Sequence, residues 1–195
     1  MYKRQPYNHS YLNWANEVYK PTYITQHTLN LTGGSEVGRY LVSFDYLDQP
    51  GLVKNTEYQR YSYRVNTDLN IGKMLKVSSD VTYRHVDRLW PESLGSVQYD
   101  VWSMQPTSPV RYENGDYRLD KQNRNAISLM DLDVVGEDRY NMDVVYGQVK
   151  ADFEPIKDLV FTGMASLNGS WDRRKIHYKN YKYYNEAGEL VTQRN

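Results

Sequence analysis

The side chains that could carry out chemistry are scattered along this chain of 195 residues and form no recognisable catalytic motif. Its four histidines, His9, His27, His85 and His177, lack the spacing of metal ligands, and cysteine is absent. For His85, which precedes Asp87 by two positions, a hydrogen bond at the end of a strand is a better interpretation than a general base. We therefore expect no catalytic residue, no bound metal and no cofactor, and the chain is not expected to be an enzyme.

An acidic stretch in the second half of the chain comes nearest to a cation site. Asp131, Asp133, Glu137 and Asp138 could offer carboxylate oxygens to Ca²⁺. Their spacing lacks the glycine turn and the closing glutamate of a calcium-binding loop. A solvated acidic loop is therefore the favoured interpretation.

Charged residues of both signs recur at positions of the same parity in two neighbouring segments. Alternate positions of an extended strand point to the same side of a sheet, so these charges would share one face. Such a face could line the path of a bound molecule, or it could contact another part of the same protein. Its members are Arg60, Arg64, Asp68, Lys76, Asp80 and Arg84.

Aromatic residues are the most unusual feature of the composition, with 20 tyrosines, four tryptophans and three phenylalanines. Five of them lie between residues 90 and 117, within a long segment (87–140) that has no alternating pattern. Apolar ring faces bind the C–H surfaces of sugars and polar ring tips bind hydroxyl groups, so the segment is a candidate glycan contact. Packing of the segment on itself is the favoured interpretation. The five residues are Trp90, Tyr99, Trp102, Tyr112 and Tyr117.

The elements that hold these residues are predicted by a two-residue alternation of apolar and polar side chains. In residues 60–71 every odd position is Tyr, Val, Thr, Leu or Ile, and every even position is Arg, Ser, Asn or Asp. A β-strand turns successive side chains to opposite faces, so this segment is predicted to be a strand with one apolar and one polar face. Residues 75–84 repeat the pattern after the tight turn 72–74, which predicts an antiparallel hairpin.

Four further alternating segments complete a meander of about six long strands. They begin near residues 27, 40, 145 and 159. We predict an all-β antiparallel fold, organised as a loop (1–22), four strands (23–86), a long loop (87–140), two strands (141–172) and a final loop (173–195). A short helix is expected over residues 13–19.

The connections between these strands alternate between short and long. Residues 33–38, 72–74 and 154–158 form short turns, whereas 48–57 and 87–140 are longer. Transmembrane β-barrels have short turns at the periplasmic end and long loops at the extracellular end, and their strands exceed the roughly 5–6 residues usual in soluble sheets. The pattern favours an open segment of a transmembrane β-barrel. A soluble β-rich carbohydrate-binding or structural module is the alternative.

Charge and hydropathy exclude other classes of partner and anchor. The chain has 24 basic and 24 acidic residues, so no net charge attracts nucleic acid, and none is expected as a partner. No apolar run approaches the roughly 18 residues that a transmembrane helix needs. The first residues lack the apolar core of a signal peptide, so we expect the start of an exported protein to be missing.

One stretch of the sequence resembles a known family. Residues 27–53 carry a strand that ends in Gly33-Gly34-Ser35, a tyrosine-rich strand, and then Gln49-Pro50-Gly51 before an aliphatic pair. This pattern resembles the early barrel of the SusC/RagA family of TonB-linked outer-membrane receptors. The likeness spans most of residues 10–120, including 55–66, Leu75-Lys76-Val77 and the segment from Pro106 to Tyr117. Pro50 stands where the family usually has an acidic residue.

The resemblance implies a bacterial outer-membrane barrel of 22 strands with an N-terminal plug, energised through TonB. It also implies import of oligosaccharides or peptides with a SusD-like surface lipoprotein as partner, and membrane lipid around the barrel. We expect the plug to lie outside this sequence and the chain to supply roughly strands 2 to 7. The charged face would then line the lumen and contact the plug, and residues 87–140 would be an extracellular loop. Six strands leave two unpaired edges, so the isolated segment is expected to aggregate.

Overall fold

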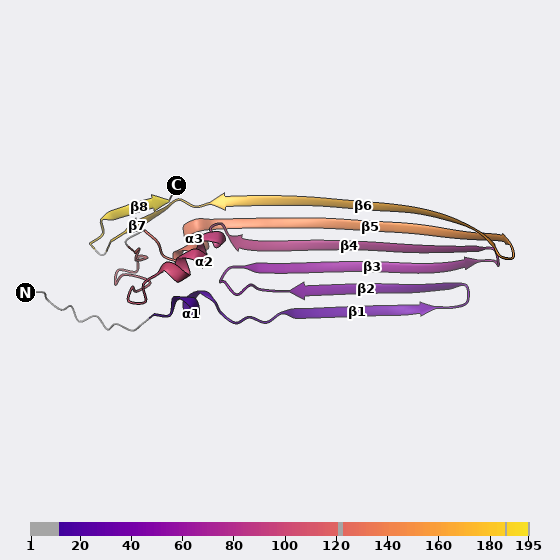
Figure 1. The fold of residues 1–195 in the computed structure, drawn as a ribbon, viewed down its shortest axis with the longest axis horizontal. Helices are drawn as coiled ribbons and strands as arrows, with labels where there is room; N and C mark the ends of the chain where they lie inside the picture. Colours follow the sequence, from indigo (N-terminus) through magenta and orange to yellow (C-terminus); the bar gives the residue numbers. More distant parts are fainter. Residues whose placement is uncertain (1–11, 121–122, 186, 195) are drawn as a thin grey trace, which may run out of the picture.

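The main feature of the fold is a long antiparallel sheet of six strands in sequence order (Figure 1). The computed structural model describes residues 12–120, 123–185 and 187–194. The sheet confirms the predicted all-β meander. Its strands are β1 (Thr25–Gly34), β2 (Gly38–Asp48), β3 (Glu57–Ile71), β4 (Leu75–Pro91), β5 (Gly136–Ile156) and β6 (Leu159–Tyr178).

The register keeps the two faces of the sheet separate across all six strands. Val65 of β3 pairs with Val42 on one side and Val81 on the other, and Leu31 and Leu167 continue the same row. We call the face that carries this row the apolar face. The opposite face, which carries the even-numbered residues of β3, is the polar face.

The apolar face has no covering layer in the described part of the chain. Val65 is 40% exposed, Leu69 45% and Val81 46%. The helices gather at one end of the sheet and do not lie along it (Figure 1). A soluble β-sandwich would bury these residues against a second layer, so the structure does not support the soluble alternative.

Strands β4, β5 and β6 extend farther than predicted. Residues 87–91 pair with 137–141, and residues 173–178 pair with 136–141. The predictions that 87–140 and 173–195 are loops throughout are therefore wrong at these ends. The side chains here do not alternate between apolar and polar, as Leu89-Trp90-Pro91 and Arg173-Arg174-Lys175 show, so the sequence carries no strand signal although the backbone pairing continues.

A small folded unit, which we call the cap, lies at the end of the sheet where the long connections are (Figure 1). Its helix α1 confirms the short helix predicted at 13–19, and the Asn13 side chain caps it by accepting a hydrogen bond from the N–H of Asn16. The hairpin β7–β8 falls in a region predicted as loop. The cap consists of α1 (Trp14–Val18), α2 (Leu94–Ser103), the 3-10 helix η1 (Ser128–Met130), α3 (Leu132–Val135), β7 (Tyr181–Tyr184), β8 (Leu190–Arg194) and the segments that join them.

Nearly all of the buried hydrophobic side chains belong to the cap. Among the described residues, Val86 and Pro91 of β4 are the exceptions. One cluster joins α1, α2 and η1, and a second joins α3 to the hairpin through Tyr117 and Tyr183. No helix within the described ranges combines the length and the apolar character needed to cross a lipid bilayer.

Candidate functional site

The polar face is held together by hydrogen bonds that run from strand to strand. Asp45 of β2 accepts hydrogen bonds from the Gln26 and Thr28 side chains of β1. On its other side, Asp45 forms an ion pair with Arg60 of β3, with 3.0 Å between Nη2 and Oδ1. Three strands are thereby joined through one carboxylate, whose charge is compensated within the sheet.

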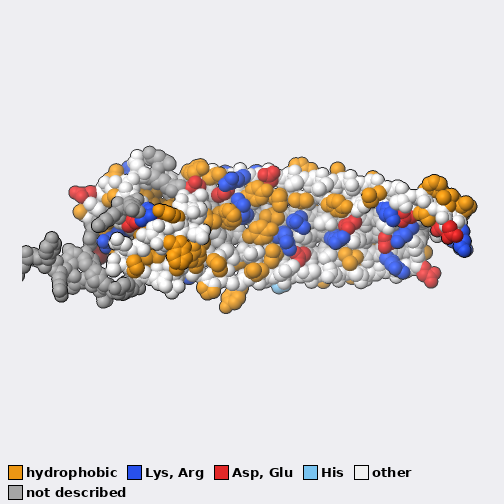
Figure 2. Space-filling view, in the orientation of Figure 1, with side chains coloured by type: hydrophobic (Ala, Val, Ile, Leu, Met, Phe, Trp, Pro, Cys, Tyr) orange, Lys and Arg blue, Asp and Glu red, His pale blue; other side chains and the backbone are white. Residues whose placement is uncertain are grey.

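The same arrangement recurs toward the end of the sheet with the short turns. Arg64 of β3 forms an ion pair of 2.5 Å with Asp80 of β4, and Ser78 donates a hydrogen bond of 2.6 Å to Asp68. Asp152 of β5 accepts from Lys150 at 2.8 Å. The polar face is therefore a mixed-charge surface on which Asp45, Asp68, Asp80 and Asp152 are already partnered. Figure 2 shows basic and acidic side chains interspersed along the sheet.

The register places all six predicted lumen-facing residues on this one face. Arg60, Arg64, Asp68 and Asp80 take part in the bonds above, whereas Lys76 borders a second hollow near the turn 72–74. Arg84 is exposed and pairs across the strands with Ser62. Contact of this face with a lumen or a plug stays a prediction.

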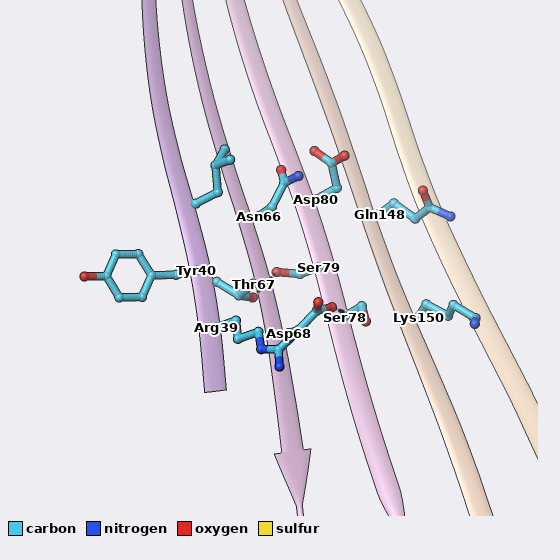
Figure 3. A pocket seen from close by; sticks show the side chains of 11 residues that line it. Arg39, Tyr40, Asn66, Thr67, Asp68, Ser78, Ser79, Asp80, Gln148 and Lys150 are labelled. Atoms are coloured by element: carbon cyan, nitrogen blue, oxygen red, sulfur yellow. Dashed lines mark hydrogen bonds between the residues drawn. The ribbon is translucent and has the colours of Figure 1, made fainter. Parts of the chain in front are cut away.

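A shallow hollow of about 430 Å³ opens on the polar face (Figure 3). Its walls come from four strands, β2 to β5, and Tyr40 is turned away from the other labelled side chains (Figure 3). The hollow offers donors and acceptors of both charges, which suits a polar polypeptide or carbohydrate surface and no particular reaction. Its main polar residues are Arg39, Asn66, Asp68, Asp80, Gln148 and Lys150.

Toward the cap, the apolar face ends at a row of three aromatic residues, two histidines and one aspartate, which we call the girdle row. Tyr46 and Tyr61 have ring centroids 4.9 Å apart, and Asp143 is bonded to the His85 ring at 2.7 Å. Amphipathic aromatic rings collect where an apolar solvent meets water. The girdle row consists of His27, Tyr46, Tyr61, His85, Asp143 and Trp171.

The next row on this face toward the cap is entirely polar. It consists of Thr25, Asp48, Gln59, Asp87, Asn141 and Arg173. At the opposite end, the apolar face stops at the row of Ile71, Leu75, Phe153 and Phe161. The apolar band thus runs along β3 from Tyr61 to Ile71, which matches the roughly 9–11 residues of a tilted transmembrane strand.

Tyr117 is a packing residue of the cap and not a ligand contact. It is 4% exposed, its hydroxyl donates to Asp131 at 2.6 Å, and the Arg111 guanidinium lies 3.7 Å from its ring centroid. Burial raises the pKa of the Tyr117 hydroxyl, and the hydrogen bond to Asp131 raises it further. Internal packing, the interpretation favoured from the sequence, therefore applies to this residue.

The other four predicted aromatic contacts lie at three separate places, β4, α2 and a turn of the cap. Trp90 extends from the polar face of β4, and the Arg88 guanidinium lies 3.8 Å from its ring centroid. Tyr99 and Trp102 are three positions apart on α2 and are 68% and 75% exposed. Tyr112 lies on a turn of the cap, 5.8 Å from the Arg118 guanidinium.

Sequence reasoning missed a cluster at the cap end of the polar face. Asp138 of β5 accepts two hydrogen bonds from Arg174 of β6, at 2.9 and 2.7 Å, and lies 3.7 Å from Arg88 of β4. Tyr140 contacts the same Arg88, 4.9 Å from its ring centroid. All three strands were predicted as loop at these positions, so no signal in the sequence could have brought these residues together.

Two residues of the acidic stretch, Asp131 and Asp138, have structural roles. Asp131 caps α3 by accepting from the Asp133 N–H and also binds the Tyr117 hydroxyl, while Asp138 belongs to the arginine cluster. The described residues contain no group of three or more His, Cys, Asp or Glu side chains arranged to hold a metal ion.

Sequence comparison relates part of the chain to two curated receptors, although no protein-family model matches it. The chain is 30% identical over 106 residues to TonB-dependent receptor P26 of Formosa agariphila. It is 32% identical over 84 residues to TonB-dependent receptor P3 of the same organism. These matches cover 54% and 40% of this chain but 10% and 8% of the relatives, so the chain spans about a tenth of their length.

The fold resembles solved structures of the RagAB peptide importer and the RagAB peptide transporter. Each superposes with a TM-score of 0.69 and 21% identity, over 84% of this chain and 19% of the other. Identity this low shows the fold alone, whereas the matches to the curated receptors add the relationship in sequence. Together, the sequence matches and the fold support a relationship of this chain to SusC/RagA-type TonB-dependent receptors.

Proposed function

We propose that this chain forms part of the wall of a TonB-dependent importer in the bacterial outer membrane. The observation that carries the proposal is a sheet with one bare apolar face and one hydrogen-bonded polar face. Lipid can cover the first face, and a wet lumen can solvate the second. In the complete receptor we expect about 22 strands to close the barrel, because an open sheet edge is not tolerated in hydrocarbon.

The polar face would look inward onto a plug. Arg64, Asp68 and Asp80 make this face polar, which suits the water-filled inside of a transmembrane barrel. Charges of both signs can meet a plug through ion pairs and water, and the hollow between β2 and β5 offers room for a polar segment of it. TonB would supply energy through the plug.

The cap would face the outside of the cell, since long connections are extracellular in such barrels. The solved neighbours are named as a peptide importer and a peptide transporter. We propose oligosaccharides or peptides as cargo for the present receptor and a SusD-like lipoprotein as its partner. The exposed rings of Tyr99 and Trp102 on α2 are the candidate contacts with either.

Uptake by cells that carry the complete receptor tests this proposal. Labelled peptides and oligosaccharides would be offered to cells with the receptor, to cells without it and to cells without TonB. We expect the receptor in the outer-membrane fraction and TonB-dependent accumulation of one of the two cargo classes. A receptor found in a soluble fraction, or uptake of neither class, would contradict the proposal.

A further inference from the structure

Beyond the girdle row, β5 and β6 carry basic side chains on the same side of the sheet as the apolar face. Arg139 is opposite Lys175, Arg173 is opposite Asn141, and His177 is opposite Glu137. They stand at odd-numbered positions, as Trp171 does, so their side chains point to the same side of the sheet as the apolar face. We call Arg139, Arg173, Lys175 and His177 the basic stripe.

The stripe lies at the depth of lipid headgroups. Arg173 and Lys175 follow Trp171 by two and four residues, or about 7 and 13 Å along a strand that rises roughly 3.3 Å per residue. For a strand tilted by about 45°, these lengths are depths of about 5 and 9 Å above the girdle row. The headgroup layer adds roughly 5–8 Å to each side of the hydrocarbon, so the two charges fall within it or just above it.

The positive charges of the stripe are available to a ligand. Arg173 and Lys175 are exposed, and neither side chain forms a hydrogen bond or an ion pair in the described ranges. Arg174, between them in sequence, points to the opposite face and is held by Asp138 through two hydrogen bonds. The nearby Asp143 already accepts from Tyr83 and is bonded to His85.

At the cap end of the apolar face, most acidic residues and the basic residues stand on different strands. The acidic residues Asp48, Glu57 and Asp87 stand on β2, β3 and β4, while the basic stripe stands on β5 and β6. Within the stripe strands, Glu137 lies 3.6 Å from Arg139, whereas Arg173 and Lys175 have no ion-pair contact in the described ranges; Arg173 is close enough to Asp143 for their charges to interact. An anionic headgroup would therefore be attracted to β5 and β6 and repelled from β2 to β4.

We propose that the basic stripe binds the phosphate groups of a phosphorylated lipid in the leaflet on the cap side of the membrane. An arginine guanidinium matches a phosphate with two parallel N–H donors, and a lysine adds a point charge. The exposed Leu167 and Trp171 lie directly below and would contact the acyl chains of the same lipid. The inference rests on the proposed function, because it requires lipid around the apolar face.

Lipid retention by the complete receptor tests the inference. The purified receptor would be mixed with diphosphorylated lipid A, with its dephosphorylated form, or with inorganic phosphate, and binding would be measured by native mass spectrometry. The variant Arg173→Gln/Lys175→Gln should lose roughly 10- to 30-fold in affinity for the phosphorylated lipid, at about fivefold per basic residue. The dephosphorylated lipid should bind weakly and equally to both proteins.

The matched control is Lys76→Gln/Arg84→Gln, which removes one lysine and one arginine from the polar face of β4. It should bind lipid as the unaltered receptor does, and Arg173→Lys/Lys175→Arg should retain binding. An equal loss in the matched control, unchanged binding in Arg173→Gln/Lys175→Gln, or equally tight binding of inorganic phosphate alone would overturn the inference. A receptor that takes up cargo but shows no phosphate preference refutes the lipid site and leaves the proposed function standing.

Discussion

The cap and the sheet belong to one chain but follow opposite rules for their hydrophobic side chains. In the cap, Trp14 is 3% exposed and Val18 is fully buried, and both pack against α2. In the sheet, Val65 and Val81 are 40% and 46% exposed, with nothing in the described ranges above them. The two regions differ because they are built for two solvents.

If the sheet lies in lipid, as proposed, the two regions are stabilised by different interactions. In water the cap gains free energy by burying apolar surface, so it has a core. In hydrocarbon an apolar side chain gains nothing from leaving the solvent, whereas an unpaired backbone N–H is costly, so the sheet relies on its ladder of hydrogen bonds. Substitutions that remove or add apolar surface should therefore act differently in the two regions.

The largest expected effect is on the cap. Trp14→Ala should destabilise it by about 3–5 kcal/mol, because the substitution empties a core site and removes the indole hydrogen bond to the Gln105 carbonyl. Hydrogen exchange in the membrane-inserted receptor should speed up in α1 and α2 and stay unchanged in β3. Tyr99→Ala, at an exposed position of α2, is the control and should have little effect; equal acceleration in β3 would contradict the separation.

A charge introduced on the apolar face should destabilise the sheet, whereas one on the polar face should not. Val81→Arg in the middle of the apolar band should cost about 2–4 kcal/mol of folding free energy, whereas Thr82→Arg on the polar face should cost little. Denaturant titration of the receptor folded into lipid vesicles measures both. Similar costs for these neighbouring positions would show that the two faces do not meet different solvents.

A smaller effect is expected to separate the buried Tyr117 of the cap from the half-buried Tyr112. Tyr117→Phe should cost about 1–2 kcal/mol because it removes the hydroxyl that Asp131 binds. Tyr112→Phe should be close to neutral, since its hydroxyl forms no such bond in the described structure. Hydrogen exchange of α3 reports the difference, and equal values for the two variants would count against the second cluster of the cap.

The smallest effect concerns pH. Burial raises the pKa of Asp100 on α2, with a further rise from nearby Asp120 and an opposing effect of Arg124. The folded cap thus favours the protonated carboxyl, and its stability should fall as pH rises from the ordinary aspartate pKa through the raised one. Asp100→Asn should abolish this part of the pH dependence in hydrogen exchange of α2. A variant that retains the full dependence would exclude Asp100 as its source.

The sequence predicted the sheet well wherever lipid would meet it. The alternation of residues 60–71 marks one face, and the register confirms it across all six strands. Residues 87–91 and 173–178 continue the strands but lack the alternation of apolar and polar side chains, so they were predicted as loop. The Asp138–Arg174 cluster was missed for that reason.

The cap could not be read from the sequence in the same way. Tyr117 and Trp102 look alike as isolated aromatic residues, yet one is 4% and the other 75% exposed. The difference depends on partners distant in sequence, such as Asp131 for Tyr117, and no local pattern reports such contacts. The roles of the six charged residues of the polar face likewise depend on whatever faces them.

The contact between the apolar face and lipid can be measured directly along β3. The chain has no cysteine, so single cysteines can be placed at positions 62 to 70 of a cysteine-free receptor and carry nitroxide labels. In membranes, we expect oxygen dissolved in lipid to relax labels at 63, 65 and 69, and a water-soluble nickel complex to relax those at 62, 64 and 66. Accessibility without this two-residue period, or with the even positions in lipid, would contradict the account.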